Sequence, residues 1–214
     1  MLRAPEAFSM RRRLMAGLLA AAAAAPAWGA ARRPVVTVLG DSITAGLGLP
    51  QAQALPARLG AGLARLGVAA TVRGAGVSGD TSAAGLARAD FSVQADTDVC
   101  VVALGGNDLL QGIDPRETRA NLAAILRKLK ARRIGLVLAG LTVPPAVGAG
   151  YARDFNGLYP ALARSERVPL YPDLMAGVGP RLRQGDGIHP NAAGVEVIVR
   201  GLAPVVAGAL RARR

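Results

Sequence analysis

One serine and one histidine suggest the chemistry of this sequence. Ser42 lies in LGDSITAG, where an apolar run ends in glycine, and His189 in QGDGIHPNAAG is the only histidine in 214 residues. A serine hydroxyl is a weak nucleophile until a base takes its proton, and His189 is the only imidazole available for that task. Asp186 could accept a hydrogen bond from one ring nitrogen and leave the other facing Ser42. These residue types fit nucleophilic acyl transfer.

A tetrahedral intermediate at Ser42 would need hydrogen-bond donors for its oxyanion. The backbone amides of Ser42 and Gly79 are candidates because a glycine lets the backbone approach closely, and Asn107 in GGND could add a side-chain amide. Each residue also has a simpler interpretation, with Ser42 as a helix N-cap, Gly79 as a turn glycine and Asn107 as a turn amide. Only their convergence in space would favour catalysis.

The remaining reactive residue types predict no metal, cofactor or disulfide. Asp41 and Asp80 could belong to a cation site, but such sites need several carboxylates, so we expect both to stabilise loops. We expect Asp108 to brace its turn. Cys100 is the sole cysteine and lies in an apolar run, which predicts a buried, inert thiol.

The pattern of apolar residues predicts alternating strands and helices. Short apolar runs predict strands over 34–40, 68–76, 98–106, 134–141 and 168–172. Helical spacing and capping residues predict helices over 55–67, over 80–90 with Asp80 or Thr81 as N-cap, from Asp114, over 152–165, and after Pro190 or Asn191 with a disturbance at Pro204.

This alternation indicates the fold class α/β, a three-layer α/β/α sandwich on a flavodoxin-like five-stranded parallel sheet. Sites in such folds form beyond the carboxyl ends of the strands. Ser42 follows the first predicted strand, Gly79 the second, Asn107 the third, and Asp186 and His189 the fifth. We therefore expect these residues to meet at one edge of the sheet.

Four blocks in order, GDSIT, GVSGDT, GGND and DGIHP, resemble the conserved blocks of the SGNH (GDSL-type) hydrolases. The segments SGDTSAAGLAR and DFNGLYPALAR are similar to the thioesterase/arylesterase/lysophospholipase subgroup. The resemblance implies a serine esterase acting on aryl esters, acyl thioesters or lysophospholipids without a cofactor. It implies Ser42 as nucleophile and oxyanion donor, Gly79 and Asn107 as further donors, and Asp186 with His189 as the acid/base pair.

One departure and two alternatives accompany this resemblance. Residues 74–76 are Gly-Ala-Gly where the subgroup often carries an asparagine. This departure affects only the expected conformation of the nearby loop, since Gly79 is present. The alternatives are a carbohydrate O-deacetylase of the same superfamily and a non-catalytic envelope ligand-binding protein. The apolar segment 141–150 favours longer acyl or aromatic esters.

Several residues near that segment are candidates for the groove or for packing. Arg153, Asp154 and Asn156 either line the substrate groove or form a solvated helix start. The three tyrosines are predicted to pack with a solvent-facing hydroxyl: Tyr151, Tyr159 and Tyr171.

The N-terminal 30 residues have the composition of a signal peptide, which leaves residues 31–214 as the hydrolase domain. Three arginines at 11–13 precede an apolar, alanine-rich run, followed by Pro26 and small residues around 29–31. The arginine pair resembles a twin-arginine signal, and Met10 is an alternative start. The competing interpretation, an uncleaved membrane anchor, is weakened by Pro26 and by the low hydrophobicity of alanine. We predict an exported, periplasmic or secreted protein.

The net charge of +12 falls to +9 without residues 1–30, which carry four arginines and one glutamate. This charge is compatible with peripheral contact with an anionic membrane surface. Aromatic residues are sparse and neither a helix-turn-helix nor a zinc pattern is found, so we expect no nucleic-acid partner. The expected partner is a small acyl ester or thioester, and a monomer is consistent with the sequence.

Overall fold

The core of the fold is one parallel sheet. The computed structural model describes residues 32–213. Its strands are β1 (Val35–Gly40), β2 (Thr71–Gly76), β3 (Val99–Ala103), β4 (Gly135–Ala139) and β5 (Leu170–Tyr171). They lie in the order β2-β1-β3-β4-β5, and all neighbouring pairs are parallel. The predicted α/β class and five-stranded parallel sheet are confirmed.

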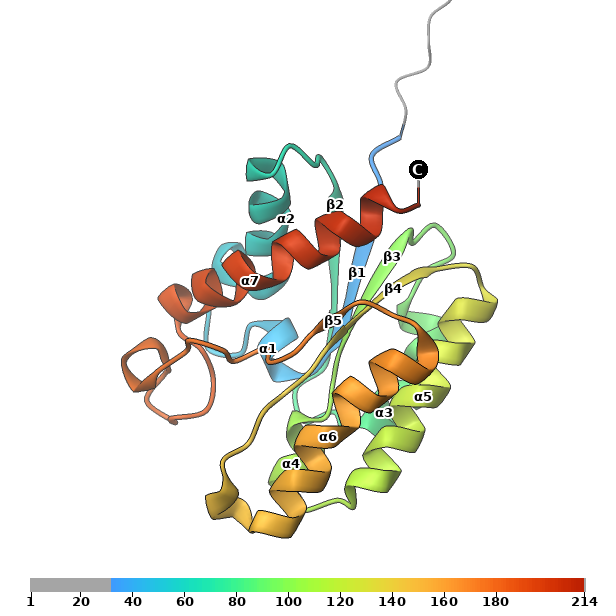
Figure 1. Ribbon diagram of the computed structural model, residues 1–214. Helices are drawn as coiled ribbons and strands as arrows, with labels where there is room; N and C mark the ends of the chain where they lie inside the picture. Colours follow the sequence, from blue (N-terminus) through green and yellow to red (C-terminus); the bar gives the residue numbers. More distant parts are fainter. Residues whose placement is uncertain (1–31, 214) are drawn as a thin grey trace, which may run out of the picture. The chain divides into compact units, whose positions relative to one another are not determined.

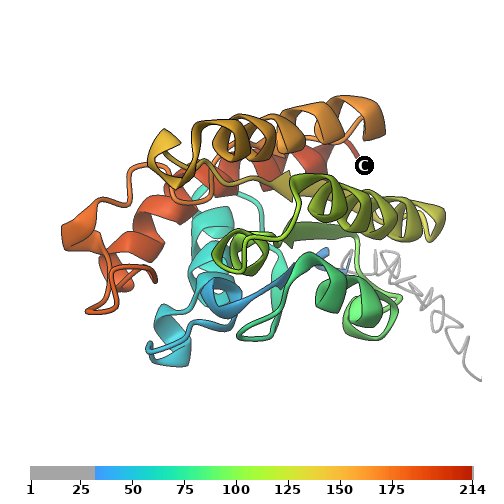
Figure 2. The ribbon, with the colours of Figure 1, turned by 90° about the horizontal axis from the view of Figure 1, so that it is seen from below.

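Two layers of helices cover the sheet. One face carries α2 (Leu55–Arg65) and α7 (Ala192–Arg211), and the other carries α3 (Ser82–Ser92), α5 (Pro115–Ala131) and α6 (Ala149–Glu166) (Figure 1). The long helices α5 and α6 run alongside each other, as the turned view shows (Figure 2). Short helices α1 (Ser42–Ala45) and α4 (Gly106–Leu110) follow β1 and β3, and single 3-10 turns span Gln51–Gln53, Pro145–Val147 and Pro180–Leu182.

The strands separate two apolar cores. Successive residues of β3 alternate between them: Val99 and Val101 pack toward α2 and α7, whereas Cys100 and Val102 pack toward α3, α5 and α6. Because both faces are covered, β1 and β3 are buried throughout and appear in the sequence as largely apolar runs, with Thr37 the one polar residue. Burial raises the pKa of the Cys100 thiol to about 12, as expected for an inert cysteine.

Capping residues set the starts of the helices. The Asp114 side chain accepts from the Arg116 amide at 2.8 Å, which confirms the predicted start of α5. Thr81, one of the two candidates, caps α3, and the Asn191 side chain caps α7.

The predicted disturbance at Pro204 does not interrupt α7, which continues to Arg211. By length and composition α7 could span a membrane, but it is a core helix here, and ten of its residues are buried. Burial of that face offsets the backbone hydrogen bond that a proline removes.

Candidate active site

The end of β1 places Ser42 at the start of a tight helical turn. Asp41 is the N-cap of α1, and its Oδ1 accepts from the Ile43 amide at 3.0 Å. Ser42 is therefore the first helical residue, and its amide donates to no acceptor among residues 32–213. Gly76 allows this turn to lie against β2, because a Cβ there would sit 2.3 Å from the Ala45 nitrogen. The Ser42 side chain thus lies at the carboxyl edge of the sheet with a free amide beside it.

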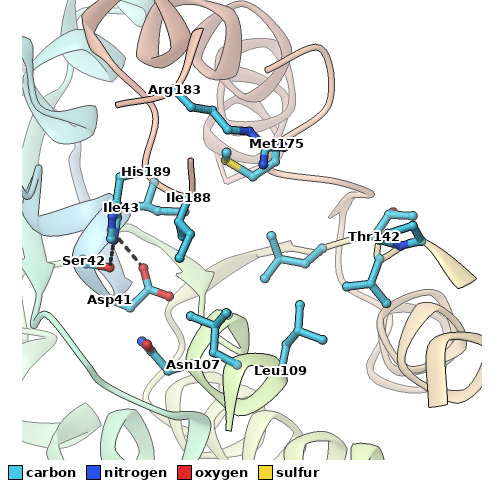
Figure 3. A pocket seen from close by; sticks show the side chains of 15 residues that line it. Asp41, Ser42, Ile43, Asn107, Leu109, Thr142, Met175, Arg183, Ile188 and His189 are labelled. Atoms are coloured by element: carbon cyan, nitrogen blue, oxygen red, sulfur yellow. Dashed lines mark hydrogen bonds between the residues drawn. The ribbon is translucent and has the colours of Figure 1, made fainter. Parts of the chain in front are cut away.

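His189 connects Ser42 to Asp186. Its Nε2 lies 2.8 Å from Ser42 Oγ, and its Nδ1 lies 2.6 Å from Asp186 Oδ2 (Figure 3 shows the Ser42 contact). Asp186 Oδ1 also accepts from the backbone amides of Ile188 at 2.8 Å and His189 at 3.0 Å. The hydrogen bond from the imidazole and these two amides lower the pKa of Asp186 to about 2. A carboxylate on Nδ1 leaves Nε2 as the acceptor that faces the serine.

The loop carrying His189 is tied to the first strand's turn. Gln184 donates from its backbone amide to the His189 carbonyl at 2.8 Å. The same residue's side-chain amide donates to the carbonyls of Leu47 at 2.8 Å and Pro190 at 3.0 Å. Because Leu47 follows α1, Gln184 fixes the distance between the histidine loop and the serine turn.

Of the two further oxyanion donors expected, Asn107 shares the cavity with Ser42, whereas Gly79 does not line it. Asn107 lines the same cavity from α4, and its Nδ2 donates to the Asp80 carbonyl at 2.8 Å, which leaves its second amide hydrogen available. Gly79 is exposed with φ +89, on the loop that also carries Asp80, and its amide has no acceptor within the described part of the chain. It is not among the residues that line the cavity.

Both acidic neighbours stabilise loops, as expected. Asp80 accepts from Arg88 Nε at 2.5 Å, and Arg88 also donates to the carbonyls of Gly40 at 2.8 Å and Ala75 at 2.9 Å. Burial raises the pKa of Asp41 to about 6, partly opposed by its hydrogen bond from Ile43. Asp41 is thus a carboxyl group that can exchange a proton near neutral pH beside the nucleophile.

Asp108 braces α4 against two other helices. It is fully buried and accepts from the Ser82 amide at 2.7 Å, from the Ser82 hydroxyl, and from Thr118 Oγ1 at 3.1 Å. Asn121 Nδ2 in turn donates to Ser82 Oγ at 3.1 Å. Because Asp108 directly follows Asn107, this network fixes the side of the cavity that bears the amide.

Tyr159 corrects one prediction. It was expected to keep its hydroxyl in solvent, but it is fully buried, and the hydroxyl donates to the Leu104 carbonyl at 2.9 Å. Gly105, at φ +113, makes this approach possible, because a Cβ there would lie 2.1 Å from the hydroxyl oxygen. Burial holds the pKa of Tyr159 well above its usual value.

An apolar cavity of about 260 Å³ adjoins Ser42. Apart from Asp41, Ser42, Asn107, Thr142, Arg183 and His189, its lining is apolar or glycine: Ile43, Gly106, Leu109, Leu110, Leu141, Val143, Pro144, Met175 and Ile188 (Figure 3). The start of the predicted groove segment, residues 141–144, does line it. Such a surface suits the hydrocarbon part of an ester.

The other groove candidates do not line this cavity. Arg153 and Asp154 border a separate groove between α5 and α6, and Asn156 exchanges two hydrogen bonds with the backbone of Val143. Asn156 therefore supports the cavity wall from outside. Sequence patterns missed Met175 and Arg183, because neither residue lies in a recognisable motif.

Metal ligands are not clustered in the described residues, where no group of three or more His, Cys, Asp or Glu side chains could hold an ion.

Comparison with known proteins yields a consistent set of similarities. Residues 38–197 match the model of the GDSL-like lipase/acylhydrolase family. The chain is 41% identical over 159 residues to Esterase TesA of Pseudomonas aeruginosa, an alignment that covers 73% of this chain and 79% of the relative. It is 38% identical over 165 residues to thioesterase 1/protease 1/lysophospholipase L1 of Escherichia coli K12, covering 76% and 78% of the two chains.

Solved structures show the same similarity. The crystal structure of AlinE4, an SGNH-hydrolase family esterase, superposes with a TM-score of 0.70 at 43% sequence identity. The superposition covers 84% of this chain and 97% of that one.

Proposed function

Because the chain belongs to the GDSL-like lipase/acylhydrolase family and is a serine esterase, we propose that Ser42, His189 and Asp186 are its catalytic residues. One observation carries the proposal: a single imidazole bridges the only serine of the cavity and a carboxylate, at 2.8 and 2.6 Å. A serine that merely capped a helix would not require either contact.

The geometry supports a two-step acyl transfer. In the first step Ser42 Oγ attacks the ester carbonyl carbon while His189 Nε2 accepts the hydroxyl proton. The tetrahedral intermediate then collapses, and the imidazolium gives this proton to the departing alcohol or thiol, which leaves an acyl-enzyme. In the second step His189 takes a proton from water, the resulting hydroxide attacks the acyl carbon, and the proton returns to Ser42 as the carboxylic acid departs.

The oxyanion would be held by the Ser42 amide, the Gly79 amide and Asn107 Nδ2. The free amide of Ser42 follows from its position as the first residue of α1, and Asn107 is held in place by Asp80 and by the neighbouring Asp108. Losing one such donor costs about 3 kcal/mol of transition-state stabilisation in comparable sites.

The cavity favours substrates with an apolar acyl or aryl group. Most of its lining is aliphatic, whereas recognition of a sugar needs several polar partners. We therefore infer that aryl esters, acyl thioesters and lysophospholipid-like esters are better substrates than acetylated carbohydrates.

Replacing the nucleophile tests the assignment. Ser42→Ala should abolish hydrolysis of p-nitrophenyl hexanoate and labelling by a fluorophosphonate, with little change in melting temperature. Ser165→Ala, on α6 and bonded only to the Leu162 carbonyl, is the matched control and should keep both activities. Turnover by a folded Ser42→Ala protein would exclude Ser42 as the nucleophile.

We also propose that the esterase is exported by a cleaved signal peptide. This segment, 1–30, lies outside the described residues, so the proposal depends on its basic, apolar and small-residue regions. N-terminal sequencing of exported protein should begin at residue 30 or 31, as cleavage between Gly29 and Ala31 requires. Exported protein that still contains residue 14 would contradict cleavage.

A further inference from the structure

Arg183 places a positive charge in the wall of the apolar cavity. It follows the 3-10 turn Pro180–Leu182, lines the cavity with Ser42 and His189, and lies beside Met175 (Figure 3). Its side chain is held from behind, because Nε donates to the Val178 carbonyl at 3.1 Å and Nη1 to the Gly187 carbonyl at 3.0 Å. Nη2 makes no hydrogen bond to residues 32–213, so part of the guanidinium is free.

No carboxylate neutralises this guanidinium among the described residues. Arg183 forms no ion pair there, in contrast to Arg58, Arg73 and Arg88, which each contact an acidic side chain. The acidic group that does line the cavity, Asp41, lies beside Ser42, and its Oδ1 accepts from the Ile43 amide. A half-buried charge without a counterion gains most from an anionic ligand.

We propose that Arg183 is a specificity-determining residue that binds an anionic group of the ester substrate, a carboxylate, phosphate or sulfate, while the aliphatic wall holds the hydrocarbon part. This inference rests on the proposed function, since it assumes that the ester bond is cleaved at Ser42. A guanidinium binds such groups through a charge-assisted, directional hydrogen bond. The preferred substrate is then an anionic amphiphile rather than a neutral ester.

A purely structural role for Arg183 makes a different prediction. Through Gly187 it braces the loop that carries Asp186 and His189. If bracing were its whole role, replacing it would slow the hydrolysis of neutral and anionic esters by the same factor. Recognition of an anion would instead slow only the anionic ester.

Matched pairs of esters separate these outcomes. The acyl-side pair is p-nitrophenyl hexanoate and mono-p-nitrophenyl adipate, and the leaving-group pair is methyl para-hexanoyloxybenzoate and para-hexanoyloxybenzoate. In Arg183→Met, kcat/KM for the anionic member of one pair should fall about tenfold relative to its neutral member, mainly through KM. The pair that responds identifies the half of the substrate that carries the anion.

Arg181→Met is the control, because Arg181 lies in the 3-10 turn that directly precedes Arg183 and carries the same charge but does not line the cavity. In each pair, it should leave the ratio of kcat/KM for the anionic ester to kcat/KM for the neutral ester unchanged. The proposal is overturned if neither ratio changes by more than about twofold in Arg183→Met, or if Arg181→Met changes a ratio equally through its charge alone. Failure of the wild-type protein to cleave either neutral ester would instead contradict the proposed function.

Discussion

Arg88 connects the serine turn to the loop that bears the expected oxyanion donor. Its guanidinium binds the Asp80 carboxylate, the carbonyl of Gly40 at the end of β1 and the carbonyl of Ala75 one residue before the end of β2. The side chains of Arg88 and Asp80 are only 19% and 12% exposed, so water cannot readily replace these partners. We predict that Arg88→Met destabilises the fold far more than the loss of an ordinary surface arginine.

The magnitude follows from burial. Removing one partner of a buried ion pair lowers the free energy of unfolding by about 3–5 kcal/mol. Because this pair keeps some exposure, we expect a loss of about 3 kcal/mol. For a domain of this size each kcal/mol lowers Tm by about 2–4 °C, which gives a loss of roughly 6–12 °C. Arg73 provides the control, since its ion pair with Asp96 is 41% and 51% exposed and is worth at most about 1 kcal/mol.

Thermal unfolding followed by circular dichroism measures both variants. Arg88→Met should lose several times more Tm than Arg73→Met, and adding Asp80→Asn to Arg88→Met should restore part of the loss by removing the unpaired carboxylate. At temperatures below both transitions, Arg88→Met should also turn over p-nitrophenyl hexanoate more slowly, because Asp80 positions the Asn107 amide. Equal losses of Tm in the two single variants would refute the argument from burial.

Three further predictions concern the ionisable groups of the site. Burial raises the pKa of Asp41 from 3.8 to about 6, so ionisation of Asp41 destabilises the folded state increasingly as pH rises from 3.8 to about 6. The variant Asp41→Asn can still accept from the Ile43 amide. It should raise the free energy of unfolding, measured by urea denaturation, by roughly 1–3 kcal/mol above about pH 7 and change it little below about pH 4. Esterase activity should fall on acidification because a protonated His189 cannot accept the Ser42 proton, and Asp41→Asn should retain this fall; a flat profile in that variant would assign the titration to Asp41. The pKa of Asp186 is lowered to about 2, so this carboxylate stays ionised in the assay range. Asp186→Asn should lower kcat by about 10³–10⁴, because the tautomer of the His189 imidazole is then no longer fixed. A loss below about tenfold would contradict an orienting role for Asp186.

The parts of the fold predicted from the sequence are those with a strong local signal. The strands β1 and β3 are largely apolar runs, and the start of α5 is marked in the sequence by its cap Asp114 and by Pro115. The predicted boundaries were less accurate where packing decides them. The apolar run of β2 begins at Val68, but strand pairing begins only at Thr71, because Val68 is buried in the core outside the sheet. The helix α4 was missed because a five-residue helix has no periodicity, and GGND has the composition of a turn.

The same distinction applies to the site. Ser42, Asp186 and His189 were predicted from residue types, and the structure brings them into contact. The neighbours that tune the site could not be predicted, because burial of Asp41 and the position of Arg183 depend on contacts between segments far apart in the chain. A local motif specifies reactive groups, whereas their electrostatic environment is a property of the whole fold.

The acid/base pair is held almost entirely by its own short loop, whereas its contact with the nucleophile joins residues 147 positions apart. Asp186 and His189 can therefore orient each other as soon as that loop forms. A reactive serine also requires the Ser42 turn and the His189 loop to have come together, with α7 docked beside α2. In refolding, burial of the core beneath α3, α5 and α6 can precede this docking, because that core contains no residue of α7. Recovery of esterase activity would then time the final docking event rather than collapse, and the enzyme would carry its own reporter of complete folding.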